Sequence, residues 1–395
     1  MTNHNLSEEQ ELLVKAQNVA LEIEGWSSLV DESGEFPIQS FNALRRGGLM
    51  GILIPKKYGG GGASLSLFSK ICQIVGGACL SSGMLWAMHA QQTAILRDFA
   101  NEALKKRILP RIASGEIYVV SVTSSKNNNQ GVFTAESTIT KEEGNISFER
   151  HAPTVSGAAH GDAFLITIRE SADKPNLTFV YAEKDQVQIQ VNPTWNSMGM
   201  RGTQSCEMSL KGSIPFDQLI SPDGGFDRIN QISMVPIGHV AWASTWLGAV
   251  KSSFIKSKKI IRSSSSKSRL NHNSDLFLEK VARIRMKLGI VDNYISEYIK
   301  KHLIMISSTD ERGKVQDIGL TIEANNLKIL SSELLCECVD ELVQLMGVRD
   351  GYLKNSEIPL ERLYRDIRSA RLMINNFDLL TINGKLSLVE NYKIY

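Results

Sequence analysis

The sequence predicts an α+β protein with an N-terminal helical domain, a middle antiparallel β domain and a C-terminal helical bundle. Three observations support this prediction. Apolar residues recur at helical spacing up to about residue 115, short β-branched segments fill the next hundred residues, and long helical periodicities return from about residue 229. Each type of element keeps to its own stretch, so we expect segregated layers and not alternating βαβ units. The predicted domains are 1–117, 118–228 and 229–395.

The N-terminal domain is predicted to consist of helices separated by turns. An apolar stripe along 12–20 indicates the first helix, and further helices are expected at 64–75 and 80–100. Pro55 and the glycine run 59–62 interrupt the pattern. They indicate a turn, because neither residue type continues a helix.

The middle and C-terminal segments differ in periodicity. Short, partly alternating segments rich in β-branched residues are typical of strands. The expected strands are 118–123, 164–168, 177–181 and 187–191. Long apolar periodicities predict helices after them. These helices are expected at 236–260, 275–305 and 316–346.

Composition excludes several classes of protein. The chain is 42% hydrophobic and 22% charged with a net charge of +2, so nothing in the balance calls for nucleic acid or a membrane surface as partner. No apolar run is long enough to span a bilayer, and no signal peptide is evident, so we expect a cytoplasmic protein. The five cysteines lack metal-ligand spacing, and we predict no metal site.

Several segments carry motifs in a fixed order. They are 53–62, 82–89 with 105–116, 195–205 with 214–215, and 344–352 with 359–368. In this order they resemble the N-terminal Pro-x-x-Tyr-Gly-Gly turn, the helix pair before the sheet, the patterned β-domain segment and the closing signature of the acyl-CoA dehydrogenase superfamily. That superfamily includes flavin monooxygenases of the same fold. Each match alone is weak, but their order makes the resemblance specific.

The resemblance implies a flavoprotein with FAD held between the β domain and the C-terminal helices. In the family, the flavin takes a hydride from an acyl thioester while a glutamate removes the α-proton. The substrate is carried on coenzyme A or an acyl carrier protein, and electrons pass to a further acceptor. In the monooxygenases, a flavin reductase instead supplies reduced flavin, which reacts with oxygen. A homotetramer or homodimer is expected.

The position that matches the family's catalytic glutamate is Ile374. The alternative base position of some members falls near His239 and also lacks a carboxylate. His239 is a candidate base, since the ordinary pKa of histidine is near neutral, or it is a helix-start histidine bonded to a carbonyl. His89 faces the flavin, as a histidine does in the monooxygenases, or packs in the core. Asn375 anchors a substrate carbonyl or caps a helix.

The resemblance also assigns contacts to the flavin. The assigned residues are Thr123, Ser124, Thr154, Ser156, Arg262, Gln344, Gly347 and Asn376. The family's acidic Gly-rich loop after residue 122 is replaced by 122–129, and Thr154 stands where the family has an aromatic residue. The segment 251–269 carries seven basic residues and no acidic one. It is either a phosphate clamp or a solvated helix end.

Three functions remain open from the sequence. The first is an FAD-dependent oxidoreductase on an acyl thioester whose usual glutamate is absent. The second is a flavin monooxygenase of the same fold, which needs no carboxylate at position 374. The third is a non-redox descendant that binds a thioester or a protein partner.

Overall fold

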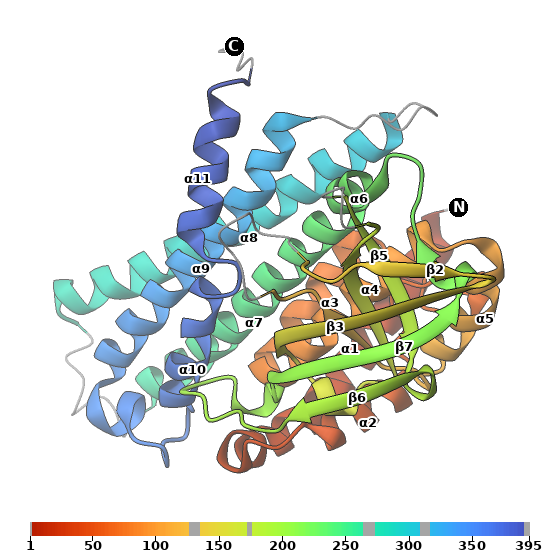
Figure 1. Ribbon diagram of the computed structural model, residues 1–395. Helices are drawn as coiled ribbons and strands as arrows, with labels where there is room; N and C mark the ends of the chain where they lie inside the picture. Colours follow the sequence, from red (N-terminus) through yellow and green to blue (C-terminus); the bar gives the residue numbers. More distant parts are fainter. Residues whose placement is uncertain (1, 126–134, 172–175, 264–272, 309–316, 391–395) are drawn as a thin grey trace.

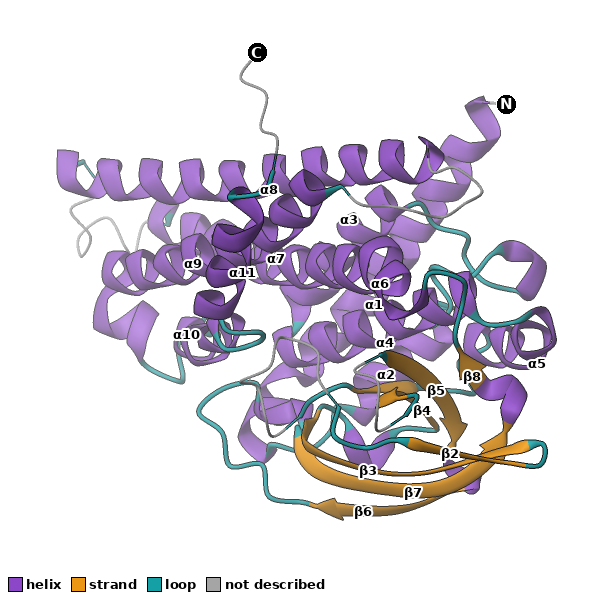
Figure 2. Cartoon of the chain, turned by 45° about the horizontal axis from the view of Figure 1, so that its top comes forward, coloured by secondary structure: helices purple, strands orange, loops and turns teal. Residues whose placement is uncertain are grey.

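The computed structural model describes residues 2–125, 135–171, 176–263, 273–308 and 317–390. Helices, then strands, then helices follow one another along the chain, which confirms the predicted fold class. Figure 2 shows the helices stacked on one side of the molecule and the strands gathered on the other. Helix α8 lies on the side away from the strands.

In the N-terminal domain, a capping residue starts α3 and a glycine ends η1. Its elements are α1 (Thr2–Ser33), α2 (Ile38–Arg46), η1 (Lys56–Tyr58), α3 (Leu65–Ala78), α4 (Leu80–Phe99) and α5 (Glu102–Ala113). Ser64 accepts the Leu67 amide at 3.2 Å and so caps the start of α3. The predicted turn is present, and Gly59 ends η1 with φ +81°, a conformation that favours glycine.

The β domain contains two four-stranded sheets, ordered β1-β4-β5-β8 and β2-β3-β7-β6. The strands are β1 (Val119–Val122), β2 (Ile139–Glu142), β3 (Asn145–Val155), β4 (Ala163–Arg169), β5 (Leu177–Glu183), β6 (Val187–Asn192), β7 (Cys206–Pro215) and β8 (Leu219–Ile220). One pair departs from the expected antiparallel arrangement, because β1 and β4 run parallel. The chain leaves the first sheet after β1, forms β2 and β3 in the second, and returns as β4. Such a long crossover permits a parallel pair.

The C-terminal domain is built around α7. Its elements are α6 (Gly225–Ile229), the π-helical η7 (Asn230–Met234), α7 (Val235–Arg262), α8 (Asp275–Ser308), α9 (Ile318–Gly347), η8 (Val348–Tyr352), α10 (Leu360–Ile367), η9 (Arg368–Arg371) and α11 (Asn376–Ser387). Helix α7 is buried along most of its length and packs against α3, α4, α8 and α9 (Figure 1). A Cβ on Gly248 would lie 2.0 Å from the Gln73 carbonyl oxygen, so glycine allows α7 to approach α3 this closely.

Polar contacts attach the β domain to α10. The Met200 amide donates to the buried Asp366 carboxyl at 2.5 Å. Arg365 pairs with Asp31 of α1 through two bonds of 2.9 and 2.6 Å and also donates to the Met198 carbonyl at 3.1 Å. Three parts of the chain therefore meet at α10. In the described part of the chain, no helix has the length and apolar character to cross a membrane.

Candidate active site

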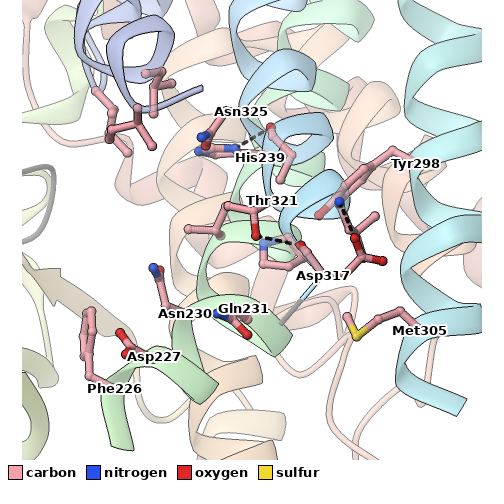
Figure 3. A pocket seen from close by; sticks show the side chains of 17 residues that line it. Phe226, Asp227, Asn230, Gln231, His239, Tyr298, Met305, Asp317, Thr321 and Asn325 are labelled. Carbon is pink, nitrogen blue, oxygen red and sulfur yellow. Dashed lines mark hydrogen bonds between the residues drawn. The ribbon is translucent and has the colours of Figure 1, made fainter. Parts of the chain in front are cut away.

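A cavity of about 290 Å³ opens between η7, the start of α7, α8, α9 and α11 (Figure 3). Figure 3 shows His239 beside Asn325 and, toward the other end, Phe226 beside Asp227. Much of the remaining wall is apolar. These apolar lining residues are Val235, Pro236, Met305, Leu320, Ala324, Ile374, Leu379 and Ile382. The volume suits a small ligand, since drug-sized sites start at about 300 Å³.

Both positions that the resemblance assigns to a catalytic base lie on this cavity. Ile374 and His239 are 135 residues apart in sequence, yet both line the same cavity. Ile374 has φ +52°, a left-handed conformation that is unfavourable for a β-branched residue. The surrounding structure therefore holds Ile374 in a backbone conformation that is unfavourable for isoleucine. Its side chain is a hydrocarbon and cannot act as a base.

Lys328 of α9 holds the backbone at this position. Its Nζ donates to the Ile374 carbonyl and to Asn376 Oδ1, both at 2.6 Å. The Asn376 amide donates in turn to Ser332 Oγ at 3.0 Å and to Glu333 Oε1 at 3.2 Å. Lys328 is fully buried, and this burial lowers its pKa to about 7, against the opposing charge of Glu333. Lys328 was not predicted as a site residue, although a lysine within the expected helix 316–346 is visible in the sequence.

His239 is neutral and has one free ring nitrogen. Nδ1 lies 2.8 Å from the Ala324 carbonyl, which can only accept, so Nδ1 carries the proton. Nε2 then has a lone pair, and it finds no hydrogen-bond partner among the residues that the structure describes. Burial lowers the pKa of His239 to about 4, and the bond to Ala324 opposes this shift. The predicted bond between His239 and a backbone carbonyl is therefore present. The second ring nitrogen of His239, Nε2, is unprotonated and unpaired.

His89 has a different environment. Its Nε2 lies 3.1 Å from the Met50 carbonyl, and its Nδ1 accepts the Val119 amide at 3.0 Å. Both nitrogens are thus used within the protein, as in a core histidine, and burial lowers its pKa to about 4. His89 is not one of the residues that line the cavity.

The two asparagines after Ile374 serve the local structure. Asn375 is exposed and accepts the Phe377 amide at 3.0 Å, which caps α11. Asn376 is buried in the cluster with Lys328. Two carboxylates also line the cavity, Asp227 and Asp317, and both are exposed residues. Asp317 caps α9 by accepting the Leu320 amide at 2.9 Å.

The four hydroxyl residues assigned to the flavin ring lie at the ends of β1 and β3. Ser124 donates to the Thr154 carbonyl at 2.7 Å and accepts the Thr154 amide at 3.1 Å, which joins the two segments. Ser156 Oγ lies 2.8 Å from Ser205 Oγ, in the patterned segment 195–205. The Thr123 hydroxyl lies 3.4 Å from that of Ser121. None of these four residues lines the cavity described above.

The hydrogen bonds of these hydroxyls decide what they offer to a flavin. Thr203 donates to the Met200 carbonyl, so Ser205 donates to Thr203, and Ser156 donates to Ser205. Ser124 likewise spends its single proton on Thr154. The oxygens of Ser124 and Ser156 keep lone pairs, which suit the ring N–H groups of an isoalloxazine. These acceptor oxygens therefore fit an N–H position on the edge of a flavin ring, while Thr154 supplies no aromatic face.

The remaining assigned residues lie elsewhere. Arg262 is exposed at the end of α7, and Gln344 is exposed and accepts from Lys280 at 3.2 Å. Gly347 ends α9 with φ +68°. Residues 126–129 of the replaced loop and residues 264–269 of the basic segment lie outside the described residues. Within the described ranges no three His, Cys, Asp or Glu side chains are placed to hold a metal, and the five cysteines are buried thiols.

Comparisons of sequence identify the family. Residues 7–116 match the acyl-CoA dehydrogenase N-terminal domain, and residues 231–373 match the acyl-CoA dehydrogenase C-terminal domain. The very long-chain specific acyl-CoA dehydrogenase of Bos taurus is 24% identical over 87% of this chain, which spans only 52% of the bovine protein. The probable acyl-CoA dehydrogenase YngJ of Bacillus subtilis (strain 168) is 22% identical over 93% of this chain and 94% of the relative.

Solved structures show the same fold. FMN-bound TdsC from Paenibacillus sp. A11-2, a dibenzothiophene monooxygenase, has a TM-score of 0.82 at 20% identity over 97% of this chain and 98% of TdsC. Butyryl-CoA dehydrogenase from Megasphaera elsdenii has a TM-score of 0.81 at 17% identity over 99% of each chain. The chain therefore belongs to the acyl-CoA dehydrogenase family, whose members are flavin oxidoreductases. The predicted resemblance is confirmed.

Proposed function

We propose that this chain is a flavin monooxygenase of the acyl-CoA dehydrogenase fold that binds a small, largely apolar substrate in the cavity of Ile374 and His239. One observation carries the proposal: the side chain at the base position is a hydrocarbon whose backbone is held by Lys328. Removing a proton from carbon requires a base within hydrogen-bond reach. Oxygenation by reduced flavin and oxygen does not require that proton to be removed.

The chain's own residues have separate tasks in this proposal. Thr123, Ser124 and Ser156 hold the edge of the flavin ring, and the flavin supplies the two-electron chemistry when bound. The apolar wall, with Ile374, Leu379 and Ile382, excludes water from the substrate. His239, held by the Ala324 carbonyl, contributes its neutral ring to the cavity wall.

A second candidate is FAD-dependent dehydrogenation of an acyl thioester, bound to coenzyme A or a carrier protein. The free lone pair of His239 Nε2 favours it, because a general base needs an unprotonated nitrogen. The low pKa of His239, about 4, argues against it, since a weak base removes a proton from carbon poorly.

Assembly into a homotetramer or homodimer is part of both proposals. Helices α8 and α11 expose large apolar side chains, as expected for surfaces that another copy covers. The most exposed of them are Leu276, Ile304 and Phe377, and the exposed Leu388 follows directly after α11. Analytical ultracentrifugation of the purified chain measures the state directly.

Flavin binding and turnover test the function. The purified chain is titrated with FAD and with FMN, and oxygen consumption is then measured with and without a flavin reductase and its reductant. We expect the chain to take up flavin in the titration. We expect substrate oxidation only when both reductase and oxygen are present. Flavin bleaching by acyl-CoA without oxygen supports the second candidate instead. A chain that takes up no flavin is a non-redox descendant, and both proposals then fail.

A further inference from the structure

We propose that Arg150, a buried residue of β3, is a positioning residue for the flavin, because its guanidinium fixes Ser124 and, through Ser124, the end of β3. The inference rests on the proposed function, since it takes these two segments as the edge that holds the flavin ring. It goes further by tracing the geometry of that edge to one buried side chain that no motif assigns to the flavin.

Arg150 interrupts an apolar row on the inward face of β3. The other members of this row, Ile146, Phe148 and Ala152, are buried and apolar. Arg150 is 1% exposed, and burial lowers the pKa of its guanidinium, against the opposing charge of Glu136. Burying a charge is unfavourable unless its polar groups are paired, so the contacts of Arg150 have to compensate for its position.

The guanidinium donates to backbone carbonyls of three separate segments. Nη2 donates to the Ser124 carbonyl at 2.6 Å, Nε donates to the Thr167 carbonyl at 3.1 Å, and Nη1 donates to the His151 carbonyl. Ser124 follows β1, Thr167 lies in β4 and His151 lies in β3. Strands β1 and β4 belong to the first sheet and β3 to the second. The planar fork of N–H groups therefore joins the two sheets just after β1 ends.

Ser124 carries this contact to the accessible edge. The register of β3 with β7 shifts between Ala152 and Val155, a bulge that contains Thr154. The Ser124 hydroxyl donates to the Thr154 carbonyl at 2.7 Å and accepts the Thr154 amide at 3.1 Å. Ser124 is partly exposed and Thr154 is exposed, whereas Arg150 is buried. Arg150 thus supports from the interior a pair of residues that a flavin can reach.

Arg150→Met tests this role, because methionine fills much of the same space and has no donor. The purified full chain is titrated with FMN and with FAD, and flavin fluorescence gives both affinities. We expect Arg150→Met to bind flavin at least about tenfold more weakly than the native chain, as the Ser124 carbonyl loses its charged donor.

Ile146→Ala is the matched control. Ile146 is buried in the same row but lies eight residues before Thr154, so its loss weakens packing away from the flavin edge. We expect this variant to be less stable than the native chain and to keep the native flavin affinity. If Arg150→Met does not fold, Arg150→Lys takes its place, because lysine keeps the charge and lacks the fork of donors.

A double substitution shows whether Arg150 acts through Ser124. Ser124→Ala removes the hydroxyl that bonds to Thr154. Two residues in one chain of contacts are not additive, so Arg150→Met should weaken flavin binding by a much smaller factor in the Ser124→Ala background. In the flavin-free chain, amide hydrogen exchange should rise at residues 119–125 and 150–155 in Arg150→Met and stay at the native level there in Ile146→Ala.

Native flavin affinity in Arg150→Met overturns the inference, as do equal losses of affinity in Ile146→Ala or independent effects of Arg150 and Ser124 in the double variant. Failure of the proposed function gives a different pattern. A native chain that binds flavin but never consumes oxygen refutes the monooxygenase assignment and keeps the role of Arg150. A native chain that takes up neither flavin refutes both.

Discussion

Burial sets the charge of two nitrogen groups beside the cavity. Lys328 and His239 are both almost inaccessible to solvent, and burial disfavours their protonated forms. Lys328 compensates with two short bonds to oxygen acceptors, whereas His239 makes one bond and leaves Nε2 free. Lys328 thus acts as a positioning residue for Ile374, whereas the Nε2 of His239 stays buried and unpaired among the described residues.

Removing the Lys328 amine tests its positioning role. We expect Lys328→Met to lower the free energy of unfolding by about 2 kcal/mol, because it leaves the Ile374 carbonyl and Asn376 Oδ1 without their donor. Lys300→Met is the matched control, since the Lys300 side chain is 70% exposed, and should change stability by less than ~0.5 kcal/mol. Urea denaturation measures both. Equal effects of the two substitutions would show that the Lys328 bonds contribute nothing.

Stability should depend on pH through the buried histidines. The pKa values of the buried His89, His239 and His302 are about 4 in the folded chain, below the 6.5 of an ordinary histidine. Between these values the unfolded chain binds protons that the folded chain does not. Unfolding free energy therefore falls as pH drops from 6.5 toward 4, by roughly 1.4 kcal/mol per pH unit for each histidine.

Asp366 acts in the opposite direction. Burial raises its pKa to about 7, so the folded chain holds a proton that the unfolded chain releases, and acidification stabilises the fold through this group. Three histidines against one carboxyl give a net loss. Urea midpoints from neutral to acidic pH measure the slope, and His239→Asn should flatten it. An unchanged slope in that variant would mean that His239 is protonated in the fold.

At the scale of elements, the close contact between α3 and α7 depends on a glycine. Gly248 is buried where a Cβ would meet the Gln73 carbonyl, whereas Gly384 on α11 is exposed and has nothing within 4 Å of its added Cβ. We expect Gly248→Ala to cost about 1–3 kcal/mol through overpacking. Gly384→Ala should stabilise by about 0.4–1 kcal/mol, since alanine loses less entropy in a helix. Thermal unfolding compares them, and a loss in both variants contradicts this account of the packing.

Periodicity predicted the long helices well. The expected segments 236–260, 275–305 and 316–346 correspond to α7, α8 and α9 within a few residues. Strands β2, β3, β7 and β8 were not predicted. Strand β3 contains Arg150, a charged residue that is 1% exposed and donates to the carbonyls of Thr167 and Ser124 at 3.1 and 2.6 Å. A buried charge breaks the polar and apolar alternation on which strand prediction depends.

Part of the site could be predicted and part could not. The family resemblance brought Ile374 and His239 to attention, and the structure places both on one cavity. The contact of Lys328 with Ile374 joins residues 46 positions apart, so no local pattern encodes it. The tautomer of His239 likewise follows from α9 packing against α7, which the sequence does not specify.

Contacts at α10 connect the three domains at the scale of the whole molecule. Asp366 accepts the Met200 amide, and the Met200 carbonyl accepts from Thr203 in the hydroxyl chain that ends at Ser156. The proposed flavin edge is thus joined by hydrogen bonds to the helix that leads toward Ile374. Asp366 is a positioning residue for both sides of the site.

Substitution at Asp366 separates this role from simple burial. Asp366→Asn keeps an oxygen acceptor for Met200, while Asp366→Leu of similar size removes it. We expect Asp366→Leu to raise amide hydrogen exchange across residues 195–205 and to lower stability by about 2 kcal/mol, and Asp366→Asn to leave exchange near the native level. Unchanged exchange in Asp366→Leu would show that Asp366 does not hold this segment.

Anaerobic titration of the flavin-loaded chain with acyl-CoA of several chain lengths, followed by flavin absorbance, tests the central claim most directly. We predict that the native chain binds flavin and that its absorbance does not bleach, because Ile374 offers no base. Bleaching of the native chain by acyl-CoA would contradict the claim, as would a chain that binds no flavin.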